Sequence, residues 1–500
     1  MKSSKISSYN WVNARILIPF WTLLAALIYL YLSTLAQTPR SSLNVMQAIS
    51  VIFFVVMFFR QRRNIYYLQS KDNIEFRSMT GMFLAMLIGV FVWSFSITFY
   101  FISDDFAHIY HAQNPILRSI WDMLVHGQAK TFMRPLGFAS IFLDYRIWHQ
   151  WAPGYHIVNL LFHLLCVSGI YFLCKELNLN NFVAVTAAII FAVMPANFET
   201  IAWLGARFDL LSASLSIWSI ILYLKFRKSE RWTQYIGALS LFILAVFSKE
   251  NAYAVPLLLL IIEYLMFTER RFKPLSGFIV AAVLALGYRW LALGGIGGYM
   301  DTAGSPAVFN YGIKTVLGLF IRVPAQTLLG FNWSQSSLAF IGIVAALIAS
   351  LLLLIALVVK PGYLGWKKLL FCFSWIVLSA LPAHQLLFIG ANLTGSRLLY
   401  LGSPGMAIYL ALALSGVKLS WFRRVALFGV IILFSFAAFF NMDAWRSTSK
   451  LSQKLLTQIV KLEPSPPSNT VFIFHNMPTT VRGVFYFRVG LQEADRKSVV

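Results

Sequence analysis

Long apolar runs are the feature that most constrains the fold of this 500-residue chain. A helix needs about 20 mostly apolar residues to cross the roughly 30 Å hydrocarbon core of a bilayer. Hydrophobic residues make up 59% of the chain and charged residues 12%, whereas soluble domains average about 45–50% and about 25%. Because a soluble core cannot bury so much apolar surface, lipid must solvate much of it. The sequence therefore predicts an all-α polytopic membrane protein.

About thirteen runs have the length and composition of membrane spans. They are Ile16–Ala36, Leu43–Phe59, Thr80–Ile102, Gly154–Cys174, Phe182–Ala196, Asp209–Phe226, Thr233–Phe247, Ala252–Phe267, Leu275–Leu293, Leu338–Val359, Leu369–Gly390, Leu398–Gly416 and Val425–Phe440.

Lysine and arginine residues occupy every second connecting segment when the N-terminus is placed in the cytoplasm. This alternation follows the positive-inside rule and supports both the number of spans and their orientation. The net charge of +23 would suggest a nucleic-acid partner in a soluble protein. Here the cytoplasmic loops account for it, so we expect a lipid bilayer as the environment and no nucleic acid.

The chain divides into three parts on this topology. Residues 1–79 form an N-terminal extension of two spans with a basic cytoplasmic loop. Residues 80–440 form the main transmembrane domain, with outside loops at 103–153 and 294–337. Residues 441–500 form an outside C-terminal segment, predicted to be small and mixed α/β.

Three shorter stretches fall outside the spans. Ile116–Val125 is amphipathic and is predicted to lie in the membrane interface. Tyr311–Gly330 is apolar but interrupted by charges and a proline, and we interpret it as re-entrant because a span there would break the alternation of basic loops. Val471–His475 has the composition of a strand.

Two adjacent carboxylates, Asp104 and Asp105, directly follow the third span. Their mutual repulsion should raise one pKa, and such a group can act as a general base or bind a metal or a basic partner. The alternative is a helix cap, for which Ser103 and both aspartates are suitable. Asp104 and His108 have the i,i+4 spacing of metal ligands, so a divalent metal stays open; a solvated helix face is the alternative.

Four basic side chains lie at the outside ends of spans. Charges at membrane depth are costly and mark functional sites, and several cations on one face suit a phosphate or pyrophosphate. For Arg134 the alternative is contact with lipid head groups, and for Arg207 it is a structural pair with Asp209. The four are Arg134, Arg207, Lys249 and Arg397.

Further polar candidates near these positions are Asp209, Glu250, His108, His156 and Tyr400. Packing is the favoured interpretation for His156. The sequence has no P-loop, G-x-S-x-G or H-E-x-x-H motif, so it indicates no ATP site, nucleophile elbow or zincin site.

Five stretches together resemble the GT-C fold of integral-membrane glycosyltransferases. They are most similar to the O-mannosyltransferases that carry transmembrane helices and tetratricopeptide repeats, and to bacterial glycosyltransferases that use polyprenyl-phosphate sugars. The stretches, in order, are Asp104-Asp105, Tyr155–His163, Pro195–Glu199 leading to Gly205–Asp209, Ser248-Lys249-Glu250 and Ser396–Ser403.

The resemblance implies a sugar donor linked to a polyprenyl phosphate, with Asp104 and Asp105 as catalytic candidates for activating an acceptor hydroxyl. Arg134, Arg207, Lys249 and Arg397 would then bind the donor phosphate, whose leaving charge they would stabilise. The reaction would invert the anomeric carbon, and the acceptor would be a glycan, a lipid or a protein.

Three other functions stay open. A polysaccharide polymerase or ligase has a similar number of helices. A transporter would place charges near span centres and show an inverted repeat, and neither is seen. A non-catalytic scaffold is the last. Because no tetratricopeptide repeat is seen, we expect a bacterial plasma membrane with the site facing the periplasm or exterior, although an endoplasmic-reticulum membrane follows the same logic.

Overall fold

The computed structural model describes residues 71–127, 131–298, 365–382, 393–417, 419–462 and 475–487, with short pieces at 312, 319–320, 323–328, 330 and 332. The predicted spans Ile16–Ala36, Leu43–Phe59 and Leu338–Val359 lie outside the described residues, as do half of Tyr311–Gly330 and nearly all of Val471–His475.

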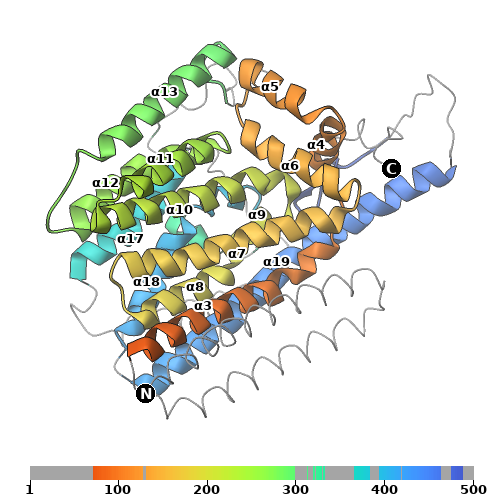
Figure 1. The fold of residues 1–500 in the computed structure, drawn as a ribbon. Helices are drawn as coiled ribbons and strands as arrows, with labels where there is room; N and C mark the ends of the chain where they lie inside the picture. Colours follow the sequence, from red (N-terminus) through yellow and green to blue (C-terminus); the bar gives the residue numbers. More distant parts are fainter. Residues whose placement is uncertain are drawn as a thin grey trace, which may run out of the picture.

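The described residues form a bundle of helices (Figure 1). Three long helices, α3 (Lys71–Trp93), α7 (Ala152–Glu176) and α19 (Ser420–Leu462), run side by side through it. The others are α8 (Asn181–Ala192), α10 (Arg207–Ser229), α11 (Trp232–Val246), α12 (Val255–Met266), α13 (Leu275–Leu293), α15 (Val323–Leu328), α17 (Gly365–Ala380) and α18 (Ser403–Ser415).

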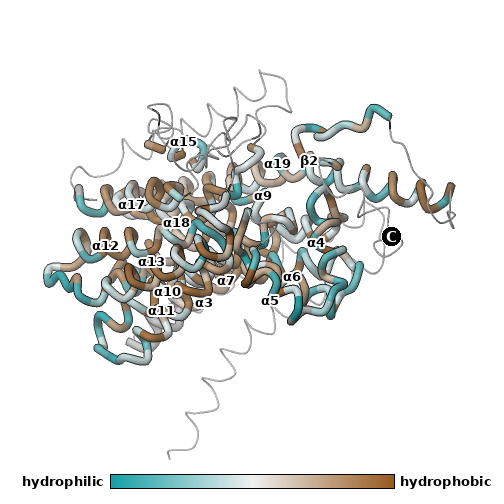
Figure 2. Tube along the Cα trace, turned by 90° about the horizontal axis from the view of Figure 1, so that it is seen from above, coloured by the Kyte–Doolittle hydropathy of each residue, from teal (hydrophilic) through white to brown (hydrophobic). Residues whose placement is uncertain are grey.

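Within this part of the chain, five helices are long and apolar enough to cross a membrane, and a sixth span results if a bent pair is counted as one. Hydrophilic segments gather at the two ends of the bundle (Figure 2). Leu284 and Leu291 of α13 are 67% and 81% exposed, which suits lipid as the solvent. The chain is therefore a multi-pass membrane protein.

The predicted span Phe182–Ala196 is wrong in one respect, because its helix breaks before the proline. Helix α8 ends at Ala192, and the short helices η3 (Pro195–Asn197) and α9 (Phe198–Ala202) continue it at an angle of 47°. Pro195 has no N–H and disfavours helical backbone in the residue before it, and Met194 is extended. The break exposes Ala192 O, which accepts a hydrogen bond from Trp93 Nε1 at 2.7 Å.

The last predicted span, Val425–Phe440, is part of a longer helix. Helix α19 continues without interruption through the polar residues after Phe440 to Leu462. Its next proline is Pro464, so nothing in the backbone chemistry ends it earlier. Trp445 and Leu456 on one face of this extension are buried.

The predicted outside loop 103–153 folds into the short helices α4 (Asp104–Ala112), α5 (Ile116–His126) and α6 (Pro135–Trp148). The stretch Ile116–Val125, predicted to lie in the membrane interface, falls within helix α5, and Trp121 on it is 65% exposed. Together with a hairpin of β1 (Thr480–Val481) and β2 (Val484–Phe485), α4 and α6 enclose a second, largely aromatic core. Phe106 and Phe487 stack there with centroids 5.5 Å apart.

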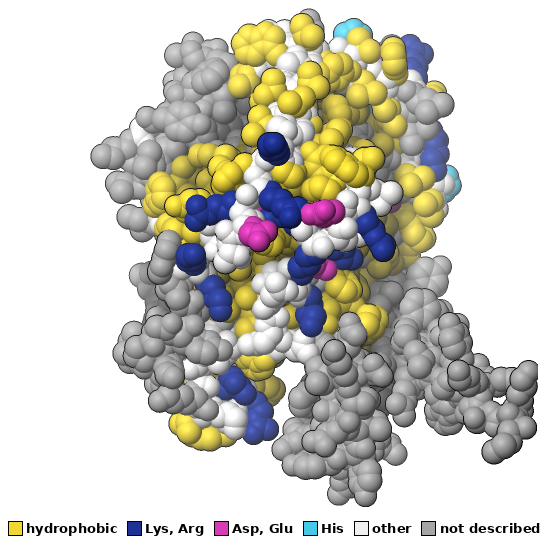
Figure 3. Space-filling model, turned by 60° about the vertical axis from the view of Figure 1, so that its left-hand side comes forward, with side chains coloured by type: hydrophobic (Ala, Val, Ile, Leu, Met, Phe, Trp, Pro, Cys, Tyr) yellow, Lys and Arg dark blue, Asp and Glu magenta, His cyan; other side chains and the backbone are white. Residues whose placement is uncertain are grey.

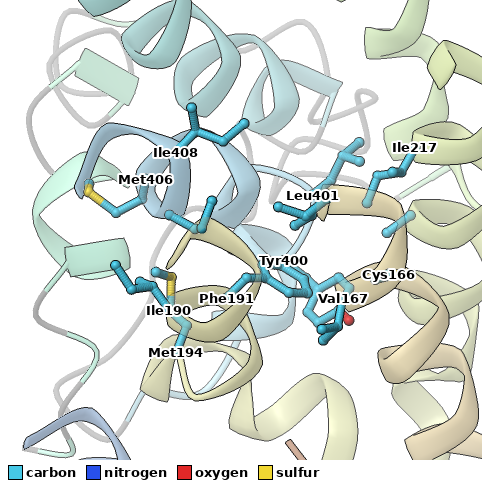
Figure 4. Packing of buried hydrophobic residues seen from close by; sticks show 14 of the residues in the cluster. Cys166, Val167, Ile190, Phe191, Met194, Ile217, Tyr400, Leu401, Met406 and Ile408 are labelled. Carbon is cyan, nitrogen blue, oxygen red and sulfur yellow. The ribbon is translucent and has the colours of Figure 1, made fainter. Parts of the chain in front are cut away.

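The main core lies inside the bundle and contains residues of α3, α7, α8, α10 and α18. Tyr400 lies within it among Phe191, Val167 and Cys166 (Figure 4). We call the end of the bundle that carries Asp104, Glu199, Lys249 and Arg397 the site end, and the opposite end, which carries the basic loops, the basic-loop end. Lysine and arginine side chains gather on the latter, where acidic ones are few (Figure 3).

Candidate functional site

The two aspartates of the Asp104-Asp105 pair occupy different environments. Both lie in the first turn of α4, and Ser103, which precedes the helix, has a positive φ of 48°. The Asp105 carboxylate accepts hydrogen bonds from the N–H groups of Ile102 at 3.0 Å and Gly205 at 2.9 Å. Asp104 is partly exposed and accepts a hydrogen bond from the Ser103 hydroxyl at 3.1 Å.

Asp105 fastens α4 to the turn before α10, since Gly205 lies in η4 (Leu204–Ala206). Burial raises the pKa of its carboxyl well above the usual range, and the neighbouring charge of Asp104 adds to the rise, while its two backbone hydrogen bonds oppose it. The expected effect of mutual repulsion is therefore present but second to burial.

Arg397 and Glu199 form one of the ion pairs at the site end. Arg397 Nη1 lies 2.7 Å from Glu199 Oε1, and the backbone N–H of Arg397 donates to Oε2 at 2.9 Å. The guanidinium also lies 5.0 Å from the ring of Trp203. Glu199 is fully buried at the start of α9, so the break in α8 is what brings this carboxylate to Arg397.

Lys249 and Asp209 form a second, buried ion pair. Burial lowers the pKa of the Lys249 amine to about 8; Asp209 opposes this, and the charges of Arg134 and Arg397 add to the lowering. Arg134 and Arg397 are therefore each within electrostatic reach of Lys249. Asp209 Oδ1 is buried and has no hydrogen-bond partner among the described residues, which is uncommon for a carboxylate oxygen.

Glu250 lies between two arginines. Arg134 donates to it through Nη2 at 2.8 Å and Nε at 3.0 Å, and Arg289 donates through Nη1 at 2.8 Å. Burial by itself would raise the pKa of the Glu250 carboxyl, but the two arginines outweigh it and hold the pKa at about 2. Arg134 also stacks on Phe132, 4.1 Å from the ring centroid.

Arg207 does not pair with Asp209, which was the structural alternative left open by the sequence. Its guanidinium is fully buried and forms an ion pair with Asp144 of α6 at 2.8 Å. It further donates to the side chain of Asn159 and, at 2.8 Å, to the carbonyl of Tyr155. These contacts join α6, α7 and α10 and leave no exposed surface for a ligand.

The remaining sequence candidates lie in packed surroundings. His108 lies edge-on to Phe138 and Phe208, with centroids 5.3 and 5.5 Å away, and burial lowers its pKa to about 4, so it is neutral near pH 7. His156 packs edge-on against Phe99 inside the bundle. Tyr400 Oη lies 2.8 Å from Nδ1 of His163, deep in the core.

The described residues contain no group of three or more histidine, cysteine, aspartate or glutamate side chains arranged to hold a metal. Asp104 with His108 is therefore not extended to such a group within this part of the chain.

Sequence reasoning missed three contributors to the site. Arg289 lies within the predicted span Leu275–Leu293, and a charge inside an apolar span tends to mark a functional site. The sequence alone could therefore have indicated it. Asp144 shows no signal in the sequence, because it meets Arg207 only through packing. The hairpin of β1 and β2 likewise reaches the site only in three dimensions, where Ser103 N donates to Tyr486 O at 2.8 Å.

The site end of this membrane protein thus contains paired, largely buried charges beside helix α4, which begins with two aspartates. A family described as dolichyl-phosphate-mannose-protein mannosyltransferase matches residues 135–288. Protein O-mannosyl-transferase F38B6.6 of Caenorhabditis elegans is 25% identical over 327 residues, which cover 61% of this chain and 46% of that protein. Protein O-mannosyl-transferase Tmtc1 of Drosophila melanogaster is 28% identical over 135 residues, 27% of this chain and 16% of that protein. These matches confirm the resemblance to membrane O-mannosyltransferases.

The chain spans less than half the length of these relatives. Among solved structures, it is similar to the apo form of the Archaeoglobus fulgidus oligosaccharyltransferase, with a TM-score of 0.43 and 16% identity over 80% of this chain and 62% of that one. It is also similar to the archaeal oligosaccharyltransferase AglB in complex with an inhibitory peptide and a dolichol-phosphate, with a TM-score of 0.40 and 14% identity over 81% of this chain and 62% of that one.

Proposed function

We propose that this protein is a membrane glycosyltransferase that moves a sugar from a polyprenyl phosphate to an acceptor hydroxyl at the site end, on the non-cytoplasmic side of the membrane. The observation that carries the proposal is the gathering of Arg134, Lys249 and Arg397 at the end of the bundle where α4 presents Asp104. A carboxylate and a cation cluster are the two elements that such a transfer requires.

Asp104 is the general base in this mechanism. It is the partly exposed member of the pair, whereas both backbone hydrogen bonds of Asp105 lock that residue to Ile102 and Gly205. Asp104 accepts the proton of the acceptor hydroxyl as its oxygen attacks the anomeric carbon. The bond from that carbon to the phosphate oxygen breaks, and the phosphate leaves with the electron pair. A single displacement inverts the anomeric configuration.

Lys249, Arg134 and Arg397 bind the phosphate and stabilise the charge that develops on it. Arg207 has a different role in the proposal: since it is fully buried against Asp144, it positions α6, α7 and α10 rather than contacting the donor. Oδ1 of Asp209 has no hydrogen-bond partner among the described residues and is suited to accept a hydrogen bond from a sugar hydroxyl. The bacterial plasma membrane remains our proposed location.

The test is transfer of labelled sugar from polyprenyl-phosphate donors in membranes that contain wild type or Asp104→Asn, at equal expression. Loss of a general base typically costs about 10²–10⁴-fold in rate, so Asp104→Asn should lose at least about 100-fold. Asp122→Asn is the matched control, because Asp122 is an exposed carboxylate on the neighbouring helix α5, and it should transfer like wild type.

Equal transfer by wild type and Asp104→Asn would refute the base assignment. Absence of transfer from every donor would instead favour the polymerase, transporter or scaffold alternatives, and uptake of label into sealed vesicles would then separate the transporter from the other two.

A further inference from the structure

Arg289 is a buried cation that the proposed mechanism does not use. It lies in the last turns of α13, and its side chain is 7% exposed. Its Nη1 donates to Glu250 and its Nε to the carbonyl of Ile296, both at close distances of 2.8 and 2.7 Å. Burying an arginine is costly unless it is paired, so its placement calls for an explanation.

The charges around Glu250 do not balance. One carboxylate is shared by Arg134 and Arg289, which together carry two positive charges. Because the pKa of Glu250 is held at about 2, the carboxylate stays ionised at every physiological pH. The trio therefore carries a net charge of +1. Without Arg289, Arg134 and Glu250 would cancel, and the attraction of this position for an anion would fall.

The surface beside this trio is apolar along α13. A shallow recess next to Arg289 has room for about one water molecule. The lining residues are Met133, Val246, Phe247, Tyr253, Ala285 and Arg289. Met133 adjoins Arg134 in the chain, and the outer face of α13 is exposed and apolar. The net positive charge therefore lies beside an exposed apolar helix, which suits an anionic head group that carries an isoprenoid chain.

A backbone contact between the loop after α13 and the loop before Arg134 holds Arg289 in place. Gly298 N donates to Thr131 O at 2.7 Å, in the loop that leads to Arg134. At Gly297, with φ of +65°, a Cβ would lie 2.6 Å from Thr131 O and 3.3 Å from Arg289 Nη2. Glycine is required there because both the backbone conformation and the space exclude a side chain.

We propose that Arg289 is a positioning residue for an isoprenoid phosphate: because it adds a second positive charge at Glu250, the trio of Arg134, Glu250 and Arg289 keeps a net positive charge beside the exposed apolar face of α13. This rests on the proposed function, because it concerns the lipid half of the same donor.

The experiment measures binding of a polyprenyl phosphate, without sugar, to the purified full chain in detergent, so that it does not depend on transfer activity. The variants are Arg289→Gln, Glu250→Gln, the double variant and Arg289→Lys. Loss of one positive charge at a partly buried site should weaken binding on the order of 10-fold in Arg289→Gln. The double variant removes one charge of each sign, and its Kd should return to within about 3-fold of wild type. Arg289→Lys keeps the charge and should bind within about 3-fold of wild type.

The uncharged polyprenol is the matched control ligand, and its binding should not change in any variant. The proposal is overturned if Arg289→Gln binds polyprenyl phosphate like wild type. It is equally overturned if the double variant binds as weakly as Arg289→Gln, or if polyprenol binding falls in parallel, since either result assigns Arg289 a structural role. Charge-dependent binding without any sugar transfer would leave this inference standing and refute the proposed function.

Discussion

The two ends of the bundle use charge in different ways. At the site end, the pairs Lys249–Asp209 and Arg207–Asp144 are nearly withdrawn from solvent. At the basic-loop end, the Arg271–Glu230 pair has side chains that are 46% and 65% exposed. Exposed pairs contribute little to stability, whereas breaking a buried pair leaves an uncompensated charge. The effect of a charged pair on stability therefore depends on its burial.

One pair departs from this division. At the basic-loop end, Arg227 of α10 pairs with Glu263 of α12, which is fully buried and also accepts a hydrogen bond from Tyr223 at 2.7 Å. Arg227 further donates to the carbonyl of Glu269 at 2.8 Å. This pair fixes α10 against α12 and the segment that follows, far from the candidate site.

The largest expected effect on stability concerns this exception. Arg227→Ala should lower the free energy of unfolding by about 3–5 kcal/mol, because it leaves Glu263 buried and unpaired. The adjacent Lys228 is the matched control: it pairs with Glu176 at 2.9 Å but is 38% exposed, so Lys228→Ala should cost about 0–1 kcal/mol. Unfolding in detergent micelles measures both. Equal losses would remove burial as the feature that distinguishes the two pairs.

A medium effect on stability is expected for changes at Asp105, the buried aspartate of the site end. Asp105→Ala should cost about 1–3 kcal/mol of stability, because it leaves the N–H groups of Ile102 and Gly205 without their acceptor. Asp105→Asn keeps one of the two acceptor oxygens, so it should lose less stability than Asp105→Ala. If Asp105→Asn is as unstable as Asp105→Ala, the carboxylate charge itself is required.

The raised pKa of Asp105 also predicts the sign of a pH effect. Between the usual aspartate pKa of about 4 and the raised native value, the folded protein binds more protons than the unfolded one. The contribution of Asp105 to stability is therefore fully present below pH 4 and falls as pH rises through that window. The melting temperature of wild type relative to that of Asp105→Asn, measured across pH, should therefore fall as pH rises through that window.

The smallest expected effect concerns the charge of Lys249. Because the pKa of its amine is lowered to about 8, its positive charge is lost as pH rises through that value. If Lys249 binds the donor phosphate, the donor KM should rise several-fold above about pH 8 in wild type and stay flat in Lys249→Arg. Transfer rates over a range of donor concentrations and pH test this, and parallel profiles for the two proteins would exclude Lys249 as the titrating group.

Much of the architecture could be predicted from the sequence because it follows from local chemistry. The predicted span Leu275–Leu293 coincides with α13, and Thr233–Phe247 differs from α11 by a single residue at each end. An apolar stretch of this length must be helical in lipid, since no water is present to satisfy its backbone groups. The continuation of α19 to Leu462 was missed because its residues after Phe440 are too polar for a membrane span. Outside lipid, a helix needs only one face packed against its neighbours.

The sequence by itself determined that the chain crosses a membrane several times, and it named the acidic pair and the four cations, because composition and spacing act over a few residues. Only the tertiary structure decided which charge meets which. Arg207 lies two residues from Asp209 yet pairs with Asp144, and Glu250 is shared by Arg134 and Arg289 from distant segments. In a medium that solvates charges poorly, each buried cation requires the carboxylate that helix packing brings within reach. That packing depends on contacts far apart in the sequence.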